Sequence, residues 1–179
     1  MKKLFLISAV AMLMGLVACS GNKNNSTSDS SESSESVQSV EEIKDGNTFD
    51  AKSYTISYPK DWKKTFSTDD ILNVKSADEA MVFSINFDPE GPTVDQLKDK
   101  ADFAKRVNTD LYKEVGEPKI ITDNFMTLRR VTNDGEVELS YTKVLDGTKC
   151  IMGAMKSPAD KEAEAEKILM SIINSVKLK

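Results

Sequence analysis

The chain has 179 residues, of which 39% are hydrophobic, and its formal net charge is -5, with 24 Lys and Arg against 29 Asp and Glu. This length and composition fit one globular domain with some unstructured chain beside it. Because the basic residues are interleaved with a larger number of acidic ones, no basic stripe is available to neutralise phosphates, and we expect no nucleic-acid partner.

Histidine is absent from the chain. Imidazole is the usual general base near neutral pH and a common ligand for zinc and copper, so Ser-His-Asp, Cys-His and His-metal sites are excluded. Carboxylate pairs, reactive lysines and calcium sites remain possible. No spacing indicates one of them, and Asp45-Gly46-Asn47 lacks the third oxygen ligand of a calcium loop. We therefore expect a protein that is not an enzyme, with no metal site and no cofactor.

The amino terminus has the pattern of an export signal. Two lysines follow Met1, and residues 4–16 are apolar over a length that is short for a membrane span. The next residues, Leu16-Val-Ala-Cys19, resemble the lipobox of bacterial lipoproteins. That resemblance implies acylation of Cys19, cleavage after Ala18, and a lipid bilayer as partner. It also implies a protein of the bacterial cell envelope that is anchored to the outer membrane or to the outer face of the cell membrane, with its domain outside the cytoplasm. The alternative is an ordinary secretory signal with an incidental cysteine.

Residues 20–47 are rich in Ser, Asn, Asp and Glu and contain few large apolar side chains. Such a segment buries too little surface to offset its ordering entropy, and it favours a flexible tether with a reach of roughly 30 Å. A sorting or glycosylation signal in this segment is the alternative. The sequence thus predicts a signal peptide at 1–18, a lipidated tether at 19–47 and a globular domain at 48–179.

The first half of the domain shows strand periodicity. Tyr54, Ile56 and Tyr58 alternate with polar residues before Pro59. Residues 71–74 and 81–87 predict two more strands, and the second of these places Met81, Phe83, Ile85 and Phe87 on one face. Asp88-Pro-Glu-Gly-Pro92 then ends the run of strands.

A helix is predicted after this break. Thr93 and Gln96 have the spacing of a capping box, and Gly116 and Pro118 mark the end of the helical pattern. Its apolar positions are Val94, Leu97, Ala101, Ala104, Val107 and Leu111. Four strands follow at 119–122, 125–131, 137–145 and 149–155. The last three are separated by Asp-Gly turns, so the four strands predict an antiparallel meander.

The chain ends in a second predicted helix. Ser157 is the expected cap and Pro158 the expected first helical residue. The expected buried stripe is Ala163, Ile168, Leu169, Ile172, Ile173 and Val176. Runs of strands separated by single helices indicate the α+β class, here an antiparallel sheet of about six to seven strands flanked by helices.

The opening Tyr54-Thr-Ile-Ser-Tyr-Pro-Lys-Asp-Trp62 and the closing 168–176 segment, with the helix and meander between them, resemble the PsbP-like superfamily. That resemblance covers 48–179 and implies an α/β/α sandwich. It also implies an accessory or binding protein rather than an enzyme, and no functional residue is carried over from it.

Three residues are candidates for binding. Trp62, beside the Pro59 turn, is either a core residue or an exposed contact anchor, and the sequence favours the core. Arg129 and Arg130 lie within one predicted strand and must point to opposite faces. One of them is expected to run under a helix and pair with a carboxylate, with anion binding as the alternative. Cys150 is expected to be a buried thiol rather than a reactive one.

Two functions fit the sequence. The first is a membrane-anchored envelope lipoprotein that acts as a non-catalytic binding or accessory module for an unknown envelope protein. The alternative is a carrier or sensor of a small ligand held in a pocket between sheet and helix. An exposed apolar patch favours the first function, and a concave, mostly apolar cavity favours the second.

Overall fold

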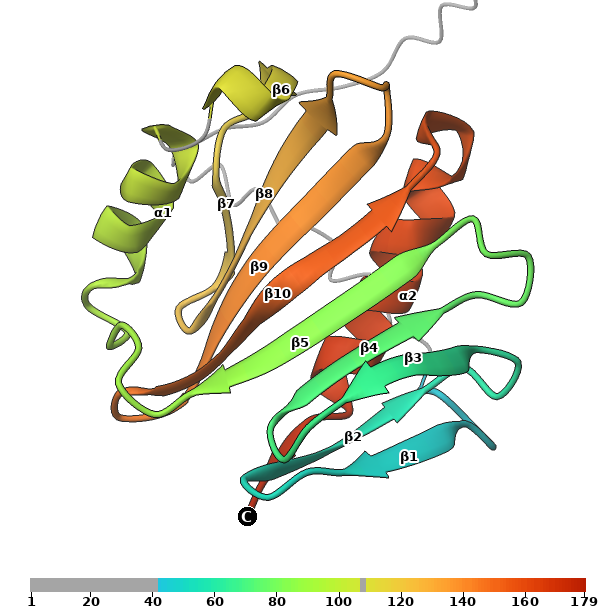
Figure 1. The fold of residues 1–179 in the computed structure, drawn as a ribbon. Coiled ribbons are helices and arrows are strands. Elements are labelled where there is room, and N and C mark those ends of the chain that lie inside the picture. Colours follow the sequence, from blue (N-terminus) through green and yellow to red (C-terminus); the bar gives the residue numbers. More distant parts are fainter. Residues whose placement is uncertain (1–41, 107–108) are drawn as a thin grey trace, which may run out of the picture. The chain divides into compact units, whose positions relative to one another are not determined.

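The computed structural model describes residues 42–106 and 109–179 (Figure 1). The strands are β1 Asn47–Asp50, β2 Tyr54–Tyr58, β3 Lys63–Ser67, β4 Ile71–Lys75, β5 Val82–Asp88, β6 Tyr112–Val115, β7 Lys119–Thr122, β8 Phe125–Thr132, β9 Val137–Asp146, β10 Lys149–Ser157 and β11 Lys177–Leu178. The α-helices are α1 Leu97–Arg106 and α2 Glu162–Asn174, and short 3₁₀ turns cover Thr109–Leu111 and Ala159–Lys161.

The described strands form two antiparallel sheets. The main sheet has the order β3-β4-β5-β10-β9-β8-β6, with β7 also paired to β8, and the small sheet has the order β1-β2-β11. The meander of β8, β9 and β10 is confirmed, and β10 joins it to the earlier meander of β3, β4 and β5 by pairing with β5. The two runs of strands therefore build one continuous main sheet.

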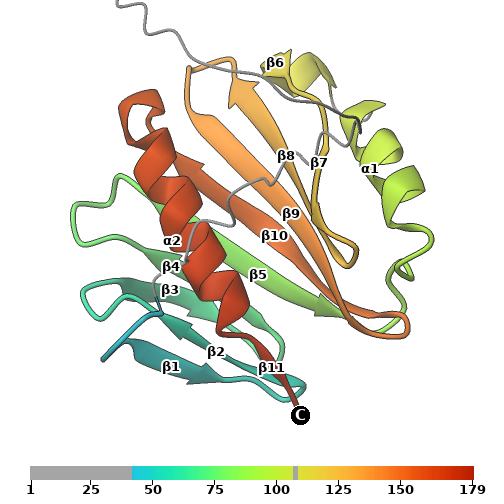
Figure 2. The same ribbon diagram turned by 180° about the vertical axis from the view of Figure 1, so that it is seen from behind.

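The two helices pack on opposite faces of the main sheet (Figures 1 and 2). On one face, Phe83, Tyr141 and Met155 meet α2 and the small sheet in the larger core. On the other face, Leu97 and Ala101 of α1 pack on Met126 and Val144 in a smaller core. The α+β class, with an antiparallel sheet flanked by helices, is confirmed. The strand count exceeds the expected six to seven because β1, β3, β6 and β11 show too little periodicity in the sequence.

The first helix is shorter than predicted. It begins at Leu97 rather than near Val94 and ends at Arg106, and the residues from Tyr112 to Val115 form β6 instead. The helix is shorter because residues 112–115 pair with β8. This pairing gives β6 backbone hydrogen bonds to β8 that these residues could not form within a longer helix. One half of the capping box is present, since the Thr93 amide donates to Gln96 Oε1 at 3.1 Å.

The start of the last helix also differs from the prediction. Ser157 ends β10 instead of capping α2, and its buried hydroxyl makes no hydrogen bond in the described part of the chain. A 3₁₀ turn follows Pro158, and α2 begins only at Glu162. Ala165 is buried and the expected Ala163 is exposed, because Ala165 lies one turn before Leu169 on the same helix face and Ala163 does not. Leu169, Ile172 and Ile173 are buried as predicted.

The packed part of the chain begins before residue 48. Ile43 packs against the larger core, and the side-chain amide of Asn47 donates to Pro59 O at 3.2 Å and to Lys60 O at 3.0 Å. The predicted signal peptide at 1–18, Cys19, residues 20–41 of the predicted tether and Val107 lie outside the described residues. Neither α1 nor α2, the α-helices of the described ranges, is long and apolar enough to cross a membrane.

Candidate functional site

Trp62 lies at the end of a tight turn between β2 and β3. Its amide donates to Pro59 O at 3.1 Å, and the Asn47 side chain holds the same turn from β1. Only 5% of the Trp62 surface is exposed, and the ring belongs to the larger core. The structure thus places Trp62 in the core position that the sequence favoured, with one edge of the residue reaching a surface groove.

That groove, which we call the Trp62 groove, lies where three segments meet: the β2–β3 turn, the β4–β5 loop and the first turns of α2. Its volume is about 380 Å³, and it is open to solvent on one side. The residues that line it are Pro59, Asp61, Trp62, Ser76, Ala77, Asp78, Met81, Lys161, Glu164 and Ile168. Trp62, Met81 and Ile168 give it an apolar floor, and charged residues form its rim.

Hydrogen bonds hold the β4–β5 wall of the groove in place. The buried Ser76 hydroxyl donates to Asp78 Oδ1 at 2.6 Å and accepts from the Met81 amide at 2.9 Å. Asp78 also forms an ion pair with Lys161, which links this loop to the start of α2. The Lys161 side chain, the Ser76 hydroxyl and the Ala80 amide hold the pKa of Asp78 well below its usual range. The groove is therefore largely pre-formed.

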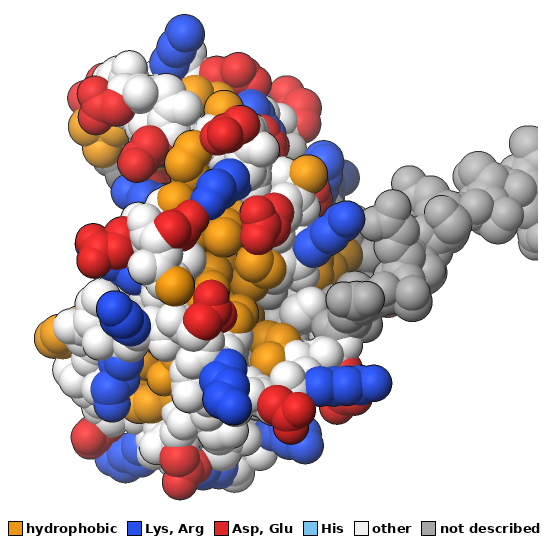
Figure 3. All heavy atoms as spheres, turned by 90° about the vertical axis from the view of Figure 1, so that its right-hand side faces the viewer, with side chains coloured by type: hydrophobic (Ala, Val, Ile, Leu, Met, Phe, Trp, Pro, Cys, Tyr) orange, Lys and Arg blue, Asp and Glu red, His pale blue; other side chains and the backbone are white. Residues whose placement is uncertain are grey.

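The rim of the groove is acidic. Lys161 forms an ion pair with Asp78, and Glu164 and Asp160 add to the rise in its pKa through space. Asp61 and Glu164 form no direct ion pair with any of the described residues, so the rim carries more negative than positive charge. Figure 3 shows the side of the molecule on which the β4–β5 loop projects, with hydrophobic atoms exposed in the middle and acidic and basic side chains around them. This combination of an apolar floor and unpaired carboxylates favours contact with a cationic, partly apolar group.

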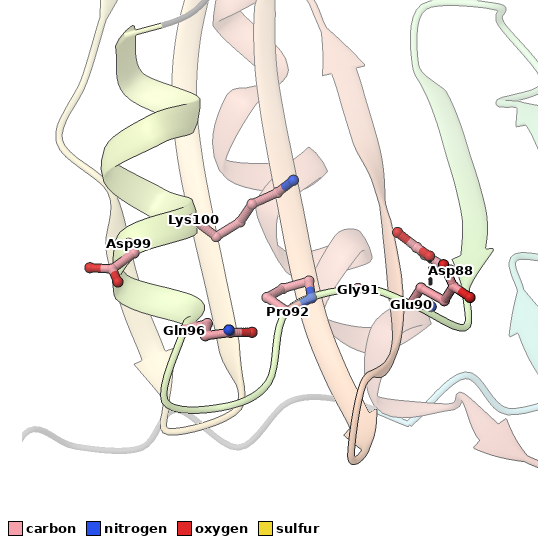
Figure 4. A pocket seen from close by; sticks show the side chains of 7 residues that line it. All are labelled: Asp88, Glu90, Gly91, Pro92, Gln96, Asp99 and Lys100. Atoms are coloured by element: carbon pink, nitrogen blue, oxygen red, sulfur yellow. Dashed lines mark hydrogen bonds between the residues drawn. The ribbon is translucent and has the colours of Figure 1, made fainter.

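A second hollow, of about 450 Å³, lies between the end of β5 and the start of α1. Its lining residues are Asp88, Glu90, Gly91, Pro92, Gln96, Asp99 and Lys100. Figure 4 shows that the carboxylates do not converge on one point, because Asp99 points away from Lys100 across α1. Nor does any group of three or more Cys, Asp or Glu in the described ranges have an arrangement that could hold a metal ion.

Cys150 lies directly beneath this second hollow. A side chain on Gly91 would come within 2.2 Å of Cys150 Sγ, so the loop needs glycine at this position to cover the thiol. Cys150 is fully buried, and burial together with the nearby Asp88 raises its pKa to about 11. Such a thiol is a poor nucleophile, because the thiolate is the reactive form.

Arg129 and Arg130 bind carboxylates on opposite faces of the main sheet. Arg129 Nε donates to Glu162 Oε1 of α2 at 2.6 Å, and Arg129 Nη1 donates to Glu114 Oε1 at 2.7 Å. Arg130 Nη2 donates to the Ala104 carbonyl at the end of α1 at 2.6 Å, and Nη1 lies 3.4 Å from Glu138 Oε1. Each arginine therefore ties one helix to the sheet, although the buried Nε of Arg130 has no hydrogen-bond partner among the described residues.

The sequence singled out the turn at Trp62 but not the groove beside it. The groove needs the β4–β5 loop and the start of α2, which are far from the turn in sequence. Asp78 and Lys161 carried no signal of their own, because lone charged residues in polar segments are common.

No protein-family model matches the chain, and no curated protein matches it. Among solved structures, a protein from Bacteroides thetaiotaomicron is similar over 75% of this chain and 48% of its own length, with 13% identity and a TM-score of 0.47. The chain thus spans about half the length of that protein. Cyanobacterial PsbP (CyanoP) from Synechocystis is similar over 70% of this chain and 86% of its own length, with 15% identity and a TM-score of 0.49.

Proposed function

We propose that this chain is a lipid-anchored protein of the bacterial cell envelope that acts as a non-catalytic binding or accessory module. The observation that carries the binding role is the Trp62 groove, with its apolar floor, its pre-formed walls and the unpaired carboxylates Asp61 and Glu164. The anchoring role is supported by Leu16-Val-Ala-Cys19, which follows a positively charged start and an apolar stretch.

The non-catalytic role is supported by the chemistry of the side chains. The chain has no histidine to serve as a general base, and the thiol of Cys150 is buried with a raised pKa. The guanidinium groups of Arg129 and Arg130 hold structural contacts. Membership of the PsbP-like superfamily is part of the same proposal and rests on the pattern of residues 48–179.

A carrier or sensor of a small ligand is the second candidate. It is favoured by the hollow between β5 and α1, which has the strand-and-helix position expected for such a pocket. Its volume falls in the range of roughly 300–1,000 Å³ that is typical of ligand pockets. That hollow is more open to solvent than the Trp62 groove, its lining is largely polar and its carboxylates diverge, so binding of a protein partner is the better supported function.

The proposal is tested in intact cells. Mass spectrometry of the mature protein should find acyl chains on Cys19, and the Cys19→Ser variant should accumulate as an unacylated precursor. Chemical crosslinking of intact envelopes should join the acylated chain to a discrete partner protein. A mature amino terminus at another residue, without lipid, contradicts the anchoring role, and the absence of any crosslinked partner contradicts the binding role.

A further inference from the structure

We propose that the Trp62 groove binds an extended peptide segment of the partner in which a lysine or arginine stands two positions from an apolar residue, so that both side chains point towards the groove. This inference rests on the proposed binding function and adds the place of contact and the chemistry of the partner. The apolar side chain would lie on the floor formed by Trp62, Met81 and Ile168, and the cation would meet Asp61 or Glu164 on the rim.

The charges of the rim select a cation. Lys161 is occupied by Asp78, whereas the exposed carboxylates Asp61 and Glu164 have no ion-pair partner among the described residues. These two carboxylates come from different elements, the β2–β3 turn and α2. A segment that crosses the groove can therefore meet both of them. Complementary charges of this kind speed association and increase specificity.

The shape of the groove favours a peptide over a small molecule. Small ligands are held by burying 70–90% or more of their surface, which needs an enclosing cavity. The Trp62 groove is open along one side, and Trp62, Met81 and Ile168 are among the residues that line it. An extended peptide needs only such a groove, because the rest of its binding energy comes from contacts outside it.

Charge also disfavours two other occupants. A second copy of the chain, docked through the same patch about a two-fold axis, would place the acidic rim against itself, and each copy carries a formal net charge of -5. A membrane surface rich in anionic lipid would repel the same rim. A basic and apolar segment of a different protein satisfies both the floor and the rim.

The test uses the full chain in non-ionic detergent micelles and two synthetic peptides, the Lys-Leu peptide acetyl-Lys-Ser-Leu-Ser-Lys-amide and the Glu-Leu peptide acetyl-Glu-Ser-Leu-Ser-Glu-amide, whose charged residues share a face with the central leucine when the peptide is extended. Trp62 is the one tryptophan in the sequence, so its fluorescence and its indole N–H resonance come from a single residue that lines the groove. We expect the Lys-Leu peptide to shift both signals saturably. The double variant Asp61→Asn/Glu164→Gln should weaken that binding at least tenfold, because both rim charges are lost.

A charge-matched control separates the rim from the net charge. The variant Asp160→Asn/Glu166→Gln removes two exposed carboxylates from the same region without touching the groove lining, and it should bind the Lys-Leu peptide like the wild type. All four positions are exposed, so we expect both variants to fold.

Four results would overturn the inference. The first two are a Glu-Leu peptide that binds as tightly as the Lys-Leu peptide, and two double variants that lose the same affinity for the Lys-Leu peptide. The other two are leucine amide saturating the Trp62 signals at the same concentration as the peptide, and Trp62 signals that shift with protein concentration or with anionic vesicles but not with peptide. The failure of this inference would leave acylation of Cys19 and the crosslinked partner in place. The failure of the proposed function would instead remove those two and leave peptide binding unchanged.

Discussion

Arg129 and Arg130 are neighbours in β8, yet Arg129 binds Glu162 of α2 and Arg130 binds the last turn of α1 on the opposite face of the main sheet. The two arginines also differ in how far they and their partners are exposed to solvent. The side chains of Arg129 and Glu162 are 33% and 29% exposed, whereas those of Arg130 and Glu138 are 10% and 9% exposed. The Arg130 guanidinium also stacks over the Tyr112 ring, with 4.8 Å between Cζ and the ring centre.

This contrast predicts different costs for the same substitution. Arg130→Met should lower the free energy of unfolding by about 3 kcal/mol, the lower end of the range for breaking a buried ion pair, because Glu138 keeps its contact with Lys156. Arg129→Met should cost only about 0.5–1 kcal/mol, since its partners are partly exposed. Urea unfolding of the two variants checks both values, and equal losses would contradict the assignment of Arg130 to a buried network.

The burial of Trp62 predicts a large loss of stability on truncation. Trp62→Ala should lower the free energy of unfolding by about 3–5 kcal/mol, as for other buried large aromatic residues. Phe66→Ala is the matched control, because Phe66 is 51% exposed and its truncation should cost little. A Trp62→Ala protein as stable as the wild type would show that the ring is a contact anchor instead of a core residue.

The pair of Asp78 and Lys161 predicts a change of stability with pH. The pKa of Asp78 lies below its usual value in the folded chain, so the unfolded chain takes up the proton first as the pH falls. The stabilisation is therefore complete above about pH 4, the usual pKa of Asp, and is lost at lower pH. The stability difference between the wild type and Asp78→Asn should be constant from pH 7 to about 5 and should shrink towards pH 2.

Denaturant unfolding at several pH values measures this difference. The control is Asp102→Asn, which removes an exposed carboxylate on α1 that forms no ion pair with the described residues. A difference for Asp78→Asn that grows as the pH falls would have the wrong sign for a carboxylate stabilised in its charged form.

The covered position of Cys150 predicts an unreactive thiol. In the Cys19→Ser variant, Cys150 is the one cysteine left in the sequence, so a thiol reagent reports on it alone. Ellman's reagent at pH 8 should give almost no reaction with the folded chain and one thiol per chain in denaturant, because burial raises the pKa of this thiol to about 11. Rapid reaction of the folded chain would show that the loop at Gly91 opens readily.

Local patterns predicted the strands best. The alternation at Tyr54, Ile56 and Tyr58 identifies β2 because the two-residue period of a strand is visible in the sequence itself. By contrast, β3 is exposed along nearly all of its length, and its Lys63-Lys-Thr-Phe-Ser67 has no buried face to produce a pattern. The helical spacing that continued to Leu111 was misleading, because pairing of β6 with β8 overrides it.

The candidate site was less predictable for a physical reason. Its acidic rim combines Asp61 of a turn with Glu164 of the last helix, and only the packing of α2 beside the small sheet and the main sheet brings them to one groove. The sequence did predict that Arg129 and Arg130 would diverge, since neighbours in a strand always do. It did not show that each one would meet a different helix.

Photo-crosslinking from inside the Trp62 groove, in living cells, tests the central claim of a lipid-anchored binding module most directly. A benzophenone amino acid replaces Ala77, an exposed residue of the groove lining, or Asp134, an exposed residue of the β8–β9 turn. We predict one discrete protein adduct from position 77 in the acylated chain, lost in the Asp61→Asn/Glu164→Gln background and absent from position 134. The same adducts from both positions, or none from position 77, would contradict the account.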